Sequence, residues 1–125
     1  MKLIAFSVAA ALVAAASAFA AEPAMIMTTS AGKAYTDDKG MTLYVYDKDE
    51  AGKSNCYDKC AANWPPFKAA AGAKAEDEWT IVQRTDGTAM WAYDGKPVYT
   101  YVKDQKAGDA TGEGAGGVWH VAKPD

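Results

Sequence analysis

Short runs of apolar, aromatic and β-branched residues alternate with turn-forming residues along most of the chain. Such runs suit the pleated, half-buried surface of a β-strand. They predict strands at 33–37, 41–46, 79–84, 88–93, 97–102 and 118–122. Turns containing Asp and Gly separate several of these runs, and glycine can take a positive φ there. The pattern therefore predicts an all-β or β-dominated fold of short antiparallel strands.

Helix is expected at only one place, near the two cysteines. Residues 55–63 can form one short helical turn. This turn must stop before Trp64-Pro65-Pro66, because proline lacks the backbone N–H and clashes with the preceding turn. The Ala/Gly stretch 68–74 and the glycine-rich stretch 106–117 predict loops. These elements fit one small domain, either a sandwich or a compact two-lobed sheet.

The N-terminal segment differs from the rest of the chain. Residues 1–20 combine one positive charge with a long apolar run that ends in Ala18-Phe19-Ala20, the pattern of a secretory signal peptide. A membrane anchor is the rival interpretation, but the run is mostly alanine and no positive cluster follows it. We therefore expect a flexible lead-in at 21–33 and a single domain at 34–125. No membrane span should remain after signal cleavage, which places the protein in the periplasm or outside the cell.

The second half of the chain repeats the first at one constant offset, the one that carries Tyr44 to Tyr99. The matched pairs are Gly40 with Gly95, Tyr44 with Tyr99, Tyr46 with Tyr101, Lys48 with Lys103, Asp49 with Asp104, and Trp64 with Trp119. Glycine, tyrosine and tryptophan rarely match by chance, so the sequence predicts two tandem repeats, at about 34–67 and 88–122. One repeat is too small to bury its own face, so the two are expected to pack together.

The repeated motif is Tyr-x-Tyr-x-x-Asp, followed by a tryptophan. Two tyrosines separated by one residue point to the same face of a strand. The aspartate just after the strand can accept hydrogen bonds from turn N–H groups or from a tyrosine hydroxyl. One interpretation is structural: each tyrosine pair, with its tryptophan, forms the core of one half-domain. The others are a ligand-binding groove lined by these aromatic residues and an active site built on tyrosine hydroxyls.

The motif resembles the secreted repeat family of predicted bacterial lipoproteins. The resemblance is carried by Tyr44, Tyr46, Asp49, Tyr99, Tyr101 and Asp104, and by Cys56, Cys60, Trp64-Pro65-Pro66 and Gly117-Val118-Trp119-His120-Val121. It implies an exported protein of the bacterial cell envelope, and it implies no activity because the family's function is unknown. The chain lacks a cysteine near the expected cleavage site, which favours a soluble periplasmic form over a lipid-anchored one.

Cys56 and Cys60 are the only cysteines of the sequence. In an oxidising compartment they predict a disulfide that closes a very short loop and pins the turn before Trp64. A redox-active pair is the alternative, because Lys59 and a helix N-terminus lower the pKa of a thiol. The spacing fits neither the usual redox pair nor covalent haem attachment, and these cysteines with one histidine are too few for a tetrahedral zinc site.

His120 is the only histidine. It lies between Trp119 and Val121, so it points to the opposite face of the strand, toward solvent or a groove. It is the one side chain with an unperturbed pKa near neutrality, which makes it our first candidate for a functional centre. Met25 and Met27 offer a copper-binding alternative together with His120, since thioethers suit Cu(I), although methionines commonly fill gaps in a core.

Charge and motif content argue against nucleic-acid binding and against common classes of enzyme. The formal charge of −3 becomes −4 when Lys2 is removed with the signal, whereas nucleic-acid binding calls for a basic face. The sequence contains no phosphate-binding loop and no nucleophile motif, and we expect no metal or cofactor. We expect a non-enzymatic binding or structural module whose partner is a small ligand, a glycan or an envelope protein. A periplasmic redox or copper-binding protein is the alternative.

Overall fold

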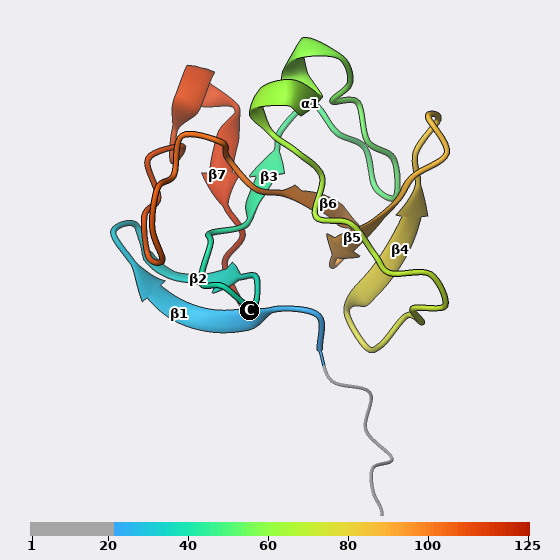
Figure 1. Ribbon diagram of the computed structural model, residues 1–125, viewed down its shortest axis with the longest axis horizontal. Coiled ribbons are helices and arrows are strands. Elements are labelled where there is room, and N and C mark those ends of the chain that lie inside the picture. Colours follow the sequence, from blue (N-terminus) through green and yellow to red (C-terminus); the bar gives the residue numbers. More distant parts are fainter. Residues whose placement is uncertain (1–21) are drawn as a thin grey trace, which may run out of the picture.

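The computed structural model describes residues 22–125 (Figure 1). In chain order the elements are β1 (Met25–Thr29), β2 (Gly32–Thr36), β3 (Tyr44–Tyr46), α1 (Lys59–Asn63), β4 (Trp79–Gln83), β5 (Ala89–Tyr93), β6 (Lys96–Tyr99), the 3-10 helix η1 (Ala115–Gly117) and β7 (Trp119–Val121). The fold is β-dominated, as the sequence predicts. In the described part of the chain, helix occurs only beside the cysteines and in the last loop.

The strands form a two-stranded sheet, β1–β2, and a five-stranded sheet in the order β4-β5-β6-β3-β7. Every pairing of neighbouring strands within these sheets is antiparallel. The β1–β2 and β4–β5 hairpins lie on opposite sides of the molecule, with β3 and β6 between them (Figure 1). The central strands therefore join two halves that each begin with a hairpin.

β3 and β6 relate these two halves to each other. Tyr44 lies directly opposite Tyr99, which is its counterpart in the other repeat. Two backbone bonds farther out are related by the same offset, Phe67 N–H to Val98 O at 3.0 Å and Ala122 N–H to Leu43 O at 2.8 Å. Antiparallel pairing of equivalent residues is what a two-fold axis requires. The two repeats are therefore related by an approximate two-fold axis that passes between β3 and β6.

Buried apolar side chains form two clusters. Alternation along the central strands decides which cluster a residue joins. Tyr44 and Tyr99 point into the first cluster, whereas Leu43 and Val98 point into the second. The other large buried members are Trp64, Met90 and Trp119 in the first cluster, and Tyr35, Trp79, Trp91 and Tyr93 in the second. Burial of these side chains is the main force that stabilises the fold.

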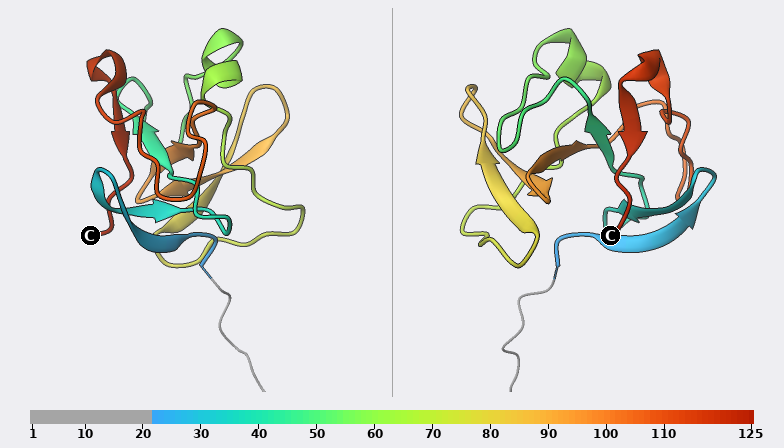
Figure 2. Two further views of the ribbon diagram at one scale, coloured as in Figure 1. Left: turned by 60° about the vertical axis from the view of Figure 1, so that its left-hand side comes forward. Right: turned by 180° about the vertical axis from the view of Figure 1, so that it is seen from behind.

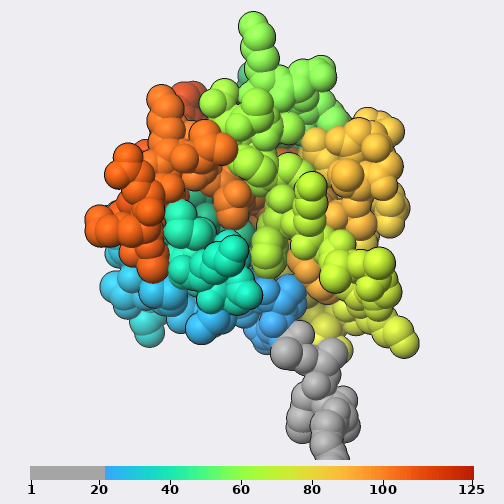
Figure 3. Space-filling model, viewed as in Figure 1, coloured from blue at the N-terminus to red at the C-terminus, as the bar shows by residue number. Residues whose placement is uncertain are grey.

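The remaining segments pack over the two clusters of buried apolar side chains. The chain between α1 and β4 runs over one face of the molecule (green to yellow-green in Figure 3) and packs Phe67, Ala69 and Ala73 on the second cluster. The β1–β2 hairpin lies across the ends of β3 and β7 (Figure 2). Two backbone bonds attach it there, Tyr35 N–H to Ala122 O at 2.8 Å and Leu43 N–H to Tyr35 O at 2.9 Å.

The structure corrects several expectations about element bounds. The flexible lead-in expected at 21–33 is wrong for residues 25–29, which form β1 and pair with β2. The strand expected at 41–46 begins only at Tyr44, and the strand expected at 97–102 ends at Tyr99. The signal peptide expected at 1–20 lies outside the described residues. Within residues 22–125, no helix has the length and hydrophobicity that crossing a bilayer would need.

Candidate functional site

Four aromatic rings form one continuous stack, which we call the aromatic column. Tyr101 stacks on Trp64 with ring centroids 3.9 Å apart, and Trp64 stacks on Trp119 at 3.9 Å. Trp119 in turn stacks on Tyr46 at 4.3 Å. Aromatic pairs of favourable geometry add about 0.5–1.5 kcal/mol each to the free energy of burial. Successive rings come from alternate repeats, so the aromatic column interleaves the two halves of the chain.

The repeated aspartates also connect the two halves. The hydroxyl of Tyr44 donates to Asp104 Oδ2 at 2.6 Å, and the hydroxyl of Tyr99 donates to Asp49 Oδ2 at 2.5 Å. Each tyrosine thus bonds to the aspartate of the other repeat. The second oxygen of each carboxylate accepts a loop amide, as Asp49 Oδ1 does from Asn55 N–H at 2.7 Å. The expectation that each repeat forms its own aromatic core is therefore wrong, because the repeats exchange their contacts.

Tyr44 and Tyr99 flank the aromatic column edge-on. Tyr44 meets Trp64 with centroids 5.2 Å apart, and Tyr99 meets Trp119 at 5.2 Å. Both tyrosines are fully buried. Burial, followed by the bond to a carboxylate, raises the pKa of both phenols, so both remain protonated hydrogen-bond donors. Burial also raises the pKa of Asp49, although the bonds from Tyr99 and Asn55 oppose that rise.

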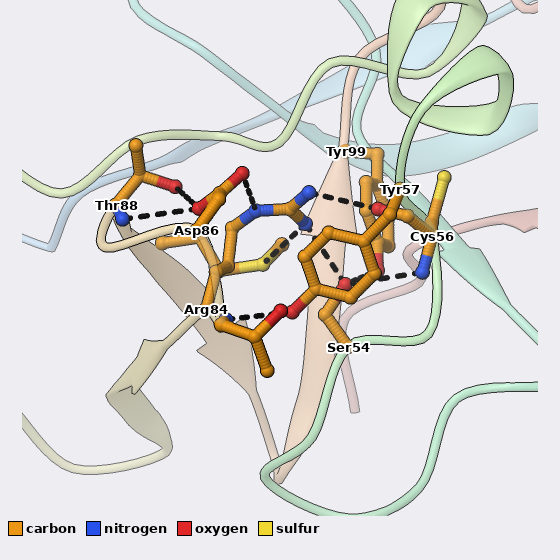
Figure 4. Close-up of polar contacts among 9 residues, drawn as sticks. Ser54, Cys56, Tyr57, Arg84, Asp86, Thr88 and Tyr99 are labelled. Atoms are coloured by element: carbon orange, nitrogen blue, oxygen red, sulfur yellow. Dashed lines mark hydrogen bonds and ion pairs between the residues drawn. The ribbon is translucent and has the colours of Figure 1, made fainter.

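Arg84, the only arginine of the sequence, is buried on the side of Tyr99 where Ser54 lies (Figure 4). Its Nη1 donates to Ser54 Oγ at 2.9 Å, and its Nη2 donates to Cys56 O at 2.8 Å. A buried guanidinium needs such partners, because an unpaired buried charge is strongly destabilising. Arg84 therefore fixes the loop that carries the cysteines against β4.

A directed chain of hydrogen bonds links Arg84 to Asp49. Ser54 Oγ lies 2.6 Å from the hydroxyl of Tyr99. Since Tyr99 donates to Asp49, Ser54 donates to Tyr99 and accepts from Arg84. Arg84 is not among the residues that the sequence predicts to form a site. The available signal was its place two residues after Val82 in a strand, which turns both side chains to the buried face.

The disulfide between Cys56 and Cys60 is present, with the two Cα atoms 5.2 Å apart. Cys56 is fully buried in the first cluster. Trp64 N–H donates to Cys60 O at 2.8 Å, so the bridge holds the turn that delivers Trp64 to the aromatic column. The prediction of a disulfide is confirmed, and the geometry suits the structural role expected for it.

His120 lies on β7, and its ring turns away from the face that buries Trp119 and Val121, as strand alternation predicts. Its Nε2 lies 3.0 Å from Asp47 Oδ2, and its Nδ1 lies 3.2 Å from Glu113 Oε2. The hydrogen bond to Glu113 and then the one to Asp47 raise the pKa of His120. The imidazole thus bridges the loop after β3 and the loop before η1.

These three side chains line a cleft of about 510 Å³. Its other charged lining residues are Asp94, Lys96, Lys123 and Asp125, and Val45 and Tyr93 also border it. The Asp47–His120 pair of the cleft does not repeat. At the offset that relates the two repeats, the counterparts of Asp47 and His120 are Val102 and Pro65. The two-fold relation therefore holds for the scaffold and fails at the cleft.

A metal centre finds no support in the side-chain geometry. Among residues 22–125, no group of three or more His, Cys, Asp and Glu side chains is arranged to hold a metal ion. The partners of His120 are carboxylates, whereas Met25 is exposed on β1 and the Met27 sulfur faces Gly40. The copper alternative therefore stays a prediction from sequence.

Comparison with known proteins supports the repeat. A family model described as a secreted repeat of unknown function matches residues 25–68 and again residues 80–123. The chain belongs to this family. The two matches are related by the same offset as the tyrosine motifs, and they begin earlier than the expected bounds because they include the first hairpin of each half. Neither the curated proteins nor the solved structures that were compared include a match.

Membership places this secreted-repeat protein in the periplasm or outside the cell, as the sequence predicts. The family description names no activity, so function has to be argued from the residues. Of the residues expected to form a site, Tyr44, Tyr46, Trp64, Tyr99, Tyr101, Trp119, Asp49 and Asp104 come together, whereas His120 lies apart in the cleft.

Proposed function

We propose that this secreted-repeat protein is a non-enzymatic binding module of the cell envelope. The duplicated aromatic residues form its internal scaffold, and the cleft around His120 receives the partner. The observation that carries the proposal is the division between duplicated and unduplicated chemistry. Residues present in both repeats bond to each other in the interior, whereas His120 and Asp47 have no counterpart of the same chemistry at the repeat offset and face an open cleft, together with Glu113.

The burial of four of the six duplicated aromatic residues argues against a ligand groove along the aromatic column, of which only the two ends, Tyr46 and Tyr101, are half-buried. Trp64 is 6% exposed and Trp119 is 5% exposed, and Tyr44 and Tyr99 are fully buried. A ligand-binding face needs open aromatic surface, and these four side chains offer almost none. Their geometry favours a structural role for the motif, in one core that the two repeats share.

The lining of the cleft indicates the chemistry of the partner. The cleft is lined by more carboxylates than lysines. The carboxylates are those of Asp47, Asp94, Glu113 and Asp125, and the lysines are Lys96 and Lys123. Such a lining favours a partner with an amino or guanidinium group, because charge-assisted hydrogen bonds to carboxylates are the stronger kind. Tyr93 and Val45 offer contact to an apolar part of the same partner. We infer a small cationic ligand or a basic segment of an envelope protein.

An enzymatic role is less well supported. Among the described residues that line the cleft, none is serine, threonine or cysteine. A nucleophile within hydrogen-bond reach of a base is the usual sign of covalent catalysis. His120 instead lies between two carboxylates, an arrangement that suits binding and charge pairing.

A binding titration tests the proposal. We would follow the backbone amides of residues 22–125 by NMR while adding a short arginine- and lysine-containing peptide. We expect shifts at residues around the cleft in the native protein and loss of these shifts in the double variant Asp47→Asn, Glu113→Gln. Glu76→Gln removes one acidic charge outside the cleft and should leave the titration unchanged. Equal binding by the double variant would refute the cleft as the binding site.

The alternative of a periplasmic redox or copper-binding protein needs a separate measurement. The intact mass of the protein purified without chelator or reductant shows whether a metal or an adduct is bound. A mass that matches the chain with one disulfide and no addition favours the binding module. A stoichiometric copper adduct that disappears in the variant Met25→Leu, Met27→Leu would instead favour the copper-binding protein.

A further inference from the structure

We propose that the aromatic column and its flanking tyrosines form a redox relay that accepts one oxidising equivalent and stores it at Tyr99. The relay needs a high-potential one-electron oxidant at the protein surface and returns to rest by one-electron reduction. This activity is independent of the cleft, because none of the relay residues lines it.

The geometry suits movement of an electron along the aromatic column. Indole and phenol rings are readily oxidised, and the faces of neighbouring rings lie in contact, with centroid separations of 3.9, 3.9 and 4.3 Å. Both ends reach the surface: Tyr101 borders a hollow beside Lys103, and Tyr46 borders a groove beside Glu50. An oxidant can therefore withdraw an electron at either end without entering the core.

The proton acceptor at Tyr99 determines where the oxidising equivalent stops. A phenol that loses an electron becomes strongly acidic and must release its proton. The O–H bond of Tyr99 breaks, and the proton passes to Asp49 Oδ2, which lies 2.5 Å from the phenol oxygen and forms the new O–H bond. One electron passes from Tyr99 to the oxidised Trp119, 5.2 Å away between ring centroids. The products are neutral Trp119, a neutral Tyr99 radical and protonated Asp49.

The surroundings of Tyr99 favour this step over the equivalent step at Tyr44. Burial raises the pKa of Asp49, which lowers the cost of placing a proton on it. Ser54 donates to the oxygen of Tyr99 at 2.6 Å and remains bonded to it after the proton has left. Tyr44 receives only the longer bond from Gly112 N–H, at 3.2 Å. The two-fold relation is thus broken by the Ser54–Arg84 side of the network.

Flash oxidation tests the relay directly. A photoexcited ruthenium(II) polypyridyl complex, quenched by a soluble electron acceptor, supplies a one-electron oxidant at the surface, and transient absorption with electron paramagnetic resonance identifies the radical. We expect a neutral tyrosyl radical in the native protein, formed more slowly in D₂O because a proton moves. In Tyr99→Phe this signal should be lost and a tryptophan radical should persist. Tyr35→Phe, which removes the hydroxyl of a buried tyrosine of the second cluster outside both the relay and the cleft, should leave the signal intact.

A second variant separates the relay from folding. Asp49→Asn keeps the volume of the side chain and removes its basicity, so the tryptophan radical should again outlast the tyrosyl radical. Thermal melting confirms that each variant is folded before its radical is measured. Absence of a tyrosyl radical in the native protein, or an unchanged tyrosyl signal in folded Tyr99→Phe or in folded Asp49→Asn, would overturn the proposal.

Discussion

Removal of either tyrosine hydroxyl that bonds to the other repeat should lower the free energy of unfolding substantially. Tyr44→Phe and Tyr99→Phe keep the rings in place and delete the bonds to Asp104 and Asp49, together with those that the two hydroxyls accept from Gly112 N–H and from Ser54. A hydrogen bond to a charged group contributes about 1.5–3 kcal/mol. Asp104 is buried and Asp49 is half-buried, so each abandoned carboxylate oxygen has restricted access to water, Asp104 most of all. We expect each single variant to lose about 2–3 kcal/mol.

The double variant Tyr44→Phe, Tyr99→Phe measures whether the two tyrosine–aspartate bonds are energetically coupled. Tyr44 and Tyr99 are directly opposite each other in the sheet, and contacting residues commonly show coupling energies of about 0.5 kcal/mol or more. Once one bond is lost, the interface between the repeats loosens, so the second should cost less. We therefore expect the double variant to lose less than the sum of the singles. It should remain folded only narrowly, because total stability is commonly about 5–15 kcal/mol.

Urea unfolding followed by tryptophan fluorescence gives the free energy of unfolding of the native protein, the two single variants and the double variant. A loss of about 2 kcal/mol corresponds to a fall in midpoint of about 1 M at unchanged slope. Tyr57→Phe is the matched control, since its hydroxyl only accepts a bond from the exposed Thr85 N–H, and it should change stability by about 0.5 kcal/mol or less. If Tyr44→Phe and Tyr99→Phe behave like Tyr57→Phe, the crossed bonds do not hold the repeats together.

Other contacts give three more tests. Gly112→Ala should lower stability by about 1–3 kcal/mol, because its Cβ would stand 2.5 Å from the Trp64 ring; an unchanged melting temperature would contradict this packing. His120 has a pKa raised above 6.5 in the folded state, so its contribution is full below pH 6.5 and is lost as the pH rises through the raised value. His120→Gln should accordingly lower the melting temperature only on the acidic side, and an equal effect on the alkaline side would refute the ion pairs as the cause. Replacement of Cys56 and Cys60 by serine should cost about 2 kcal/mol in urea unfolding, and reductant should have the same effect on the native protein but none on the variant.

The sequence predicts the duplication well because the repeat lies in residues that a strand and a turn constrain strongly. Gly40 and Gly95 both take positive φ, of 83° and 80°, and Tyr44 and Tyr99 have equivalent places in the sheet. The offset that aligns these residues also relates the backbone bonds around them. Local constraints of this kind are visible in sequence, since each one restricts a single position.

The exchange of contacts between repeats could not be predicted in the same way. An aspartate three residues after a tyrosine suggests a local bond, whereas the actual partners stand 50 and 60 positions apart. Whether a tyrosine bonds to the aspartate of its own repeat or of the other repeat depends on how the two repeats pack against each other. The pattern of residues along a strand does not specify that packing. The same holds for His120, whose carboxylate partners come from separate loops.

The crossed arrangement has a consequence for a half-length chain. Because every interleaved ring and every tyrosine–aspartate bond joins the first repeat to the second, one repeat alone holds half of each contact and completes none. Two identical copies of that half would carry both halves of each contact, on a self-complementary surface of the kind that symmetric dimers use. Internal duplication here is equivalent to a homodimer whose subunits have been joined end to end. Within one chain, unlike in a homodimer, the two halves can differ, and His120 and Arg84 each stand on one side only, opposite Pro65 and Thr29.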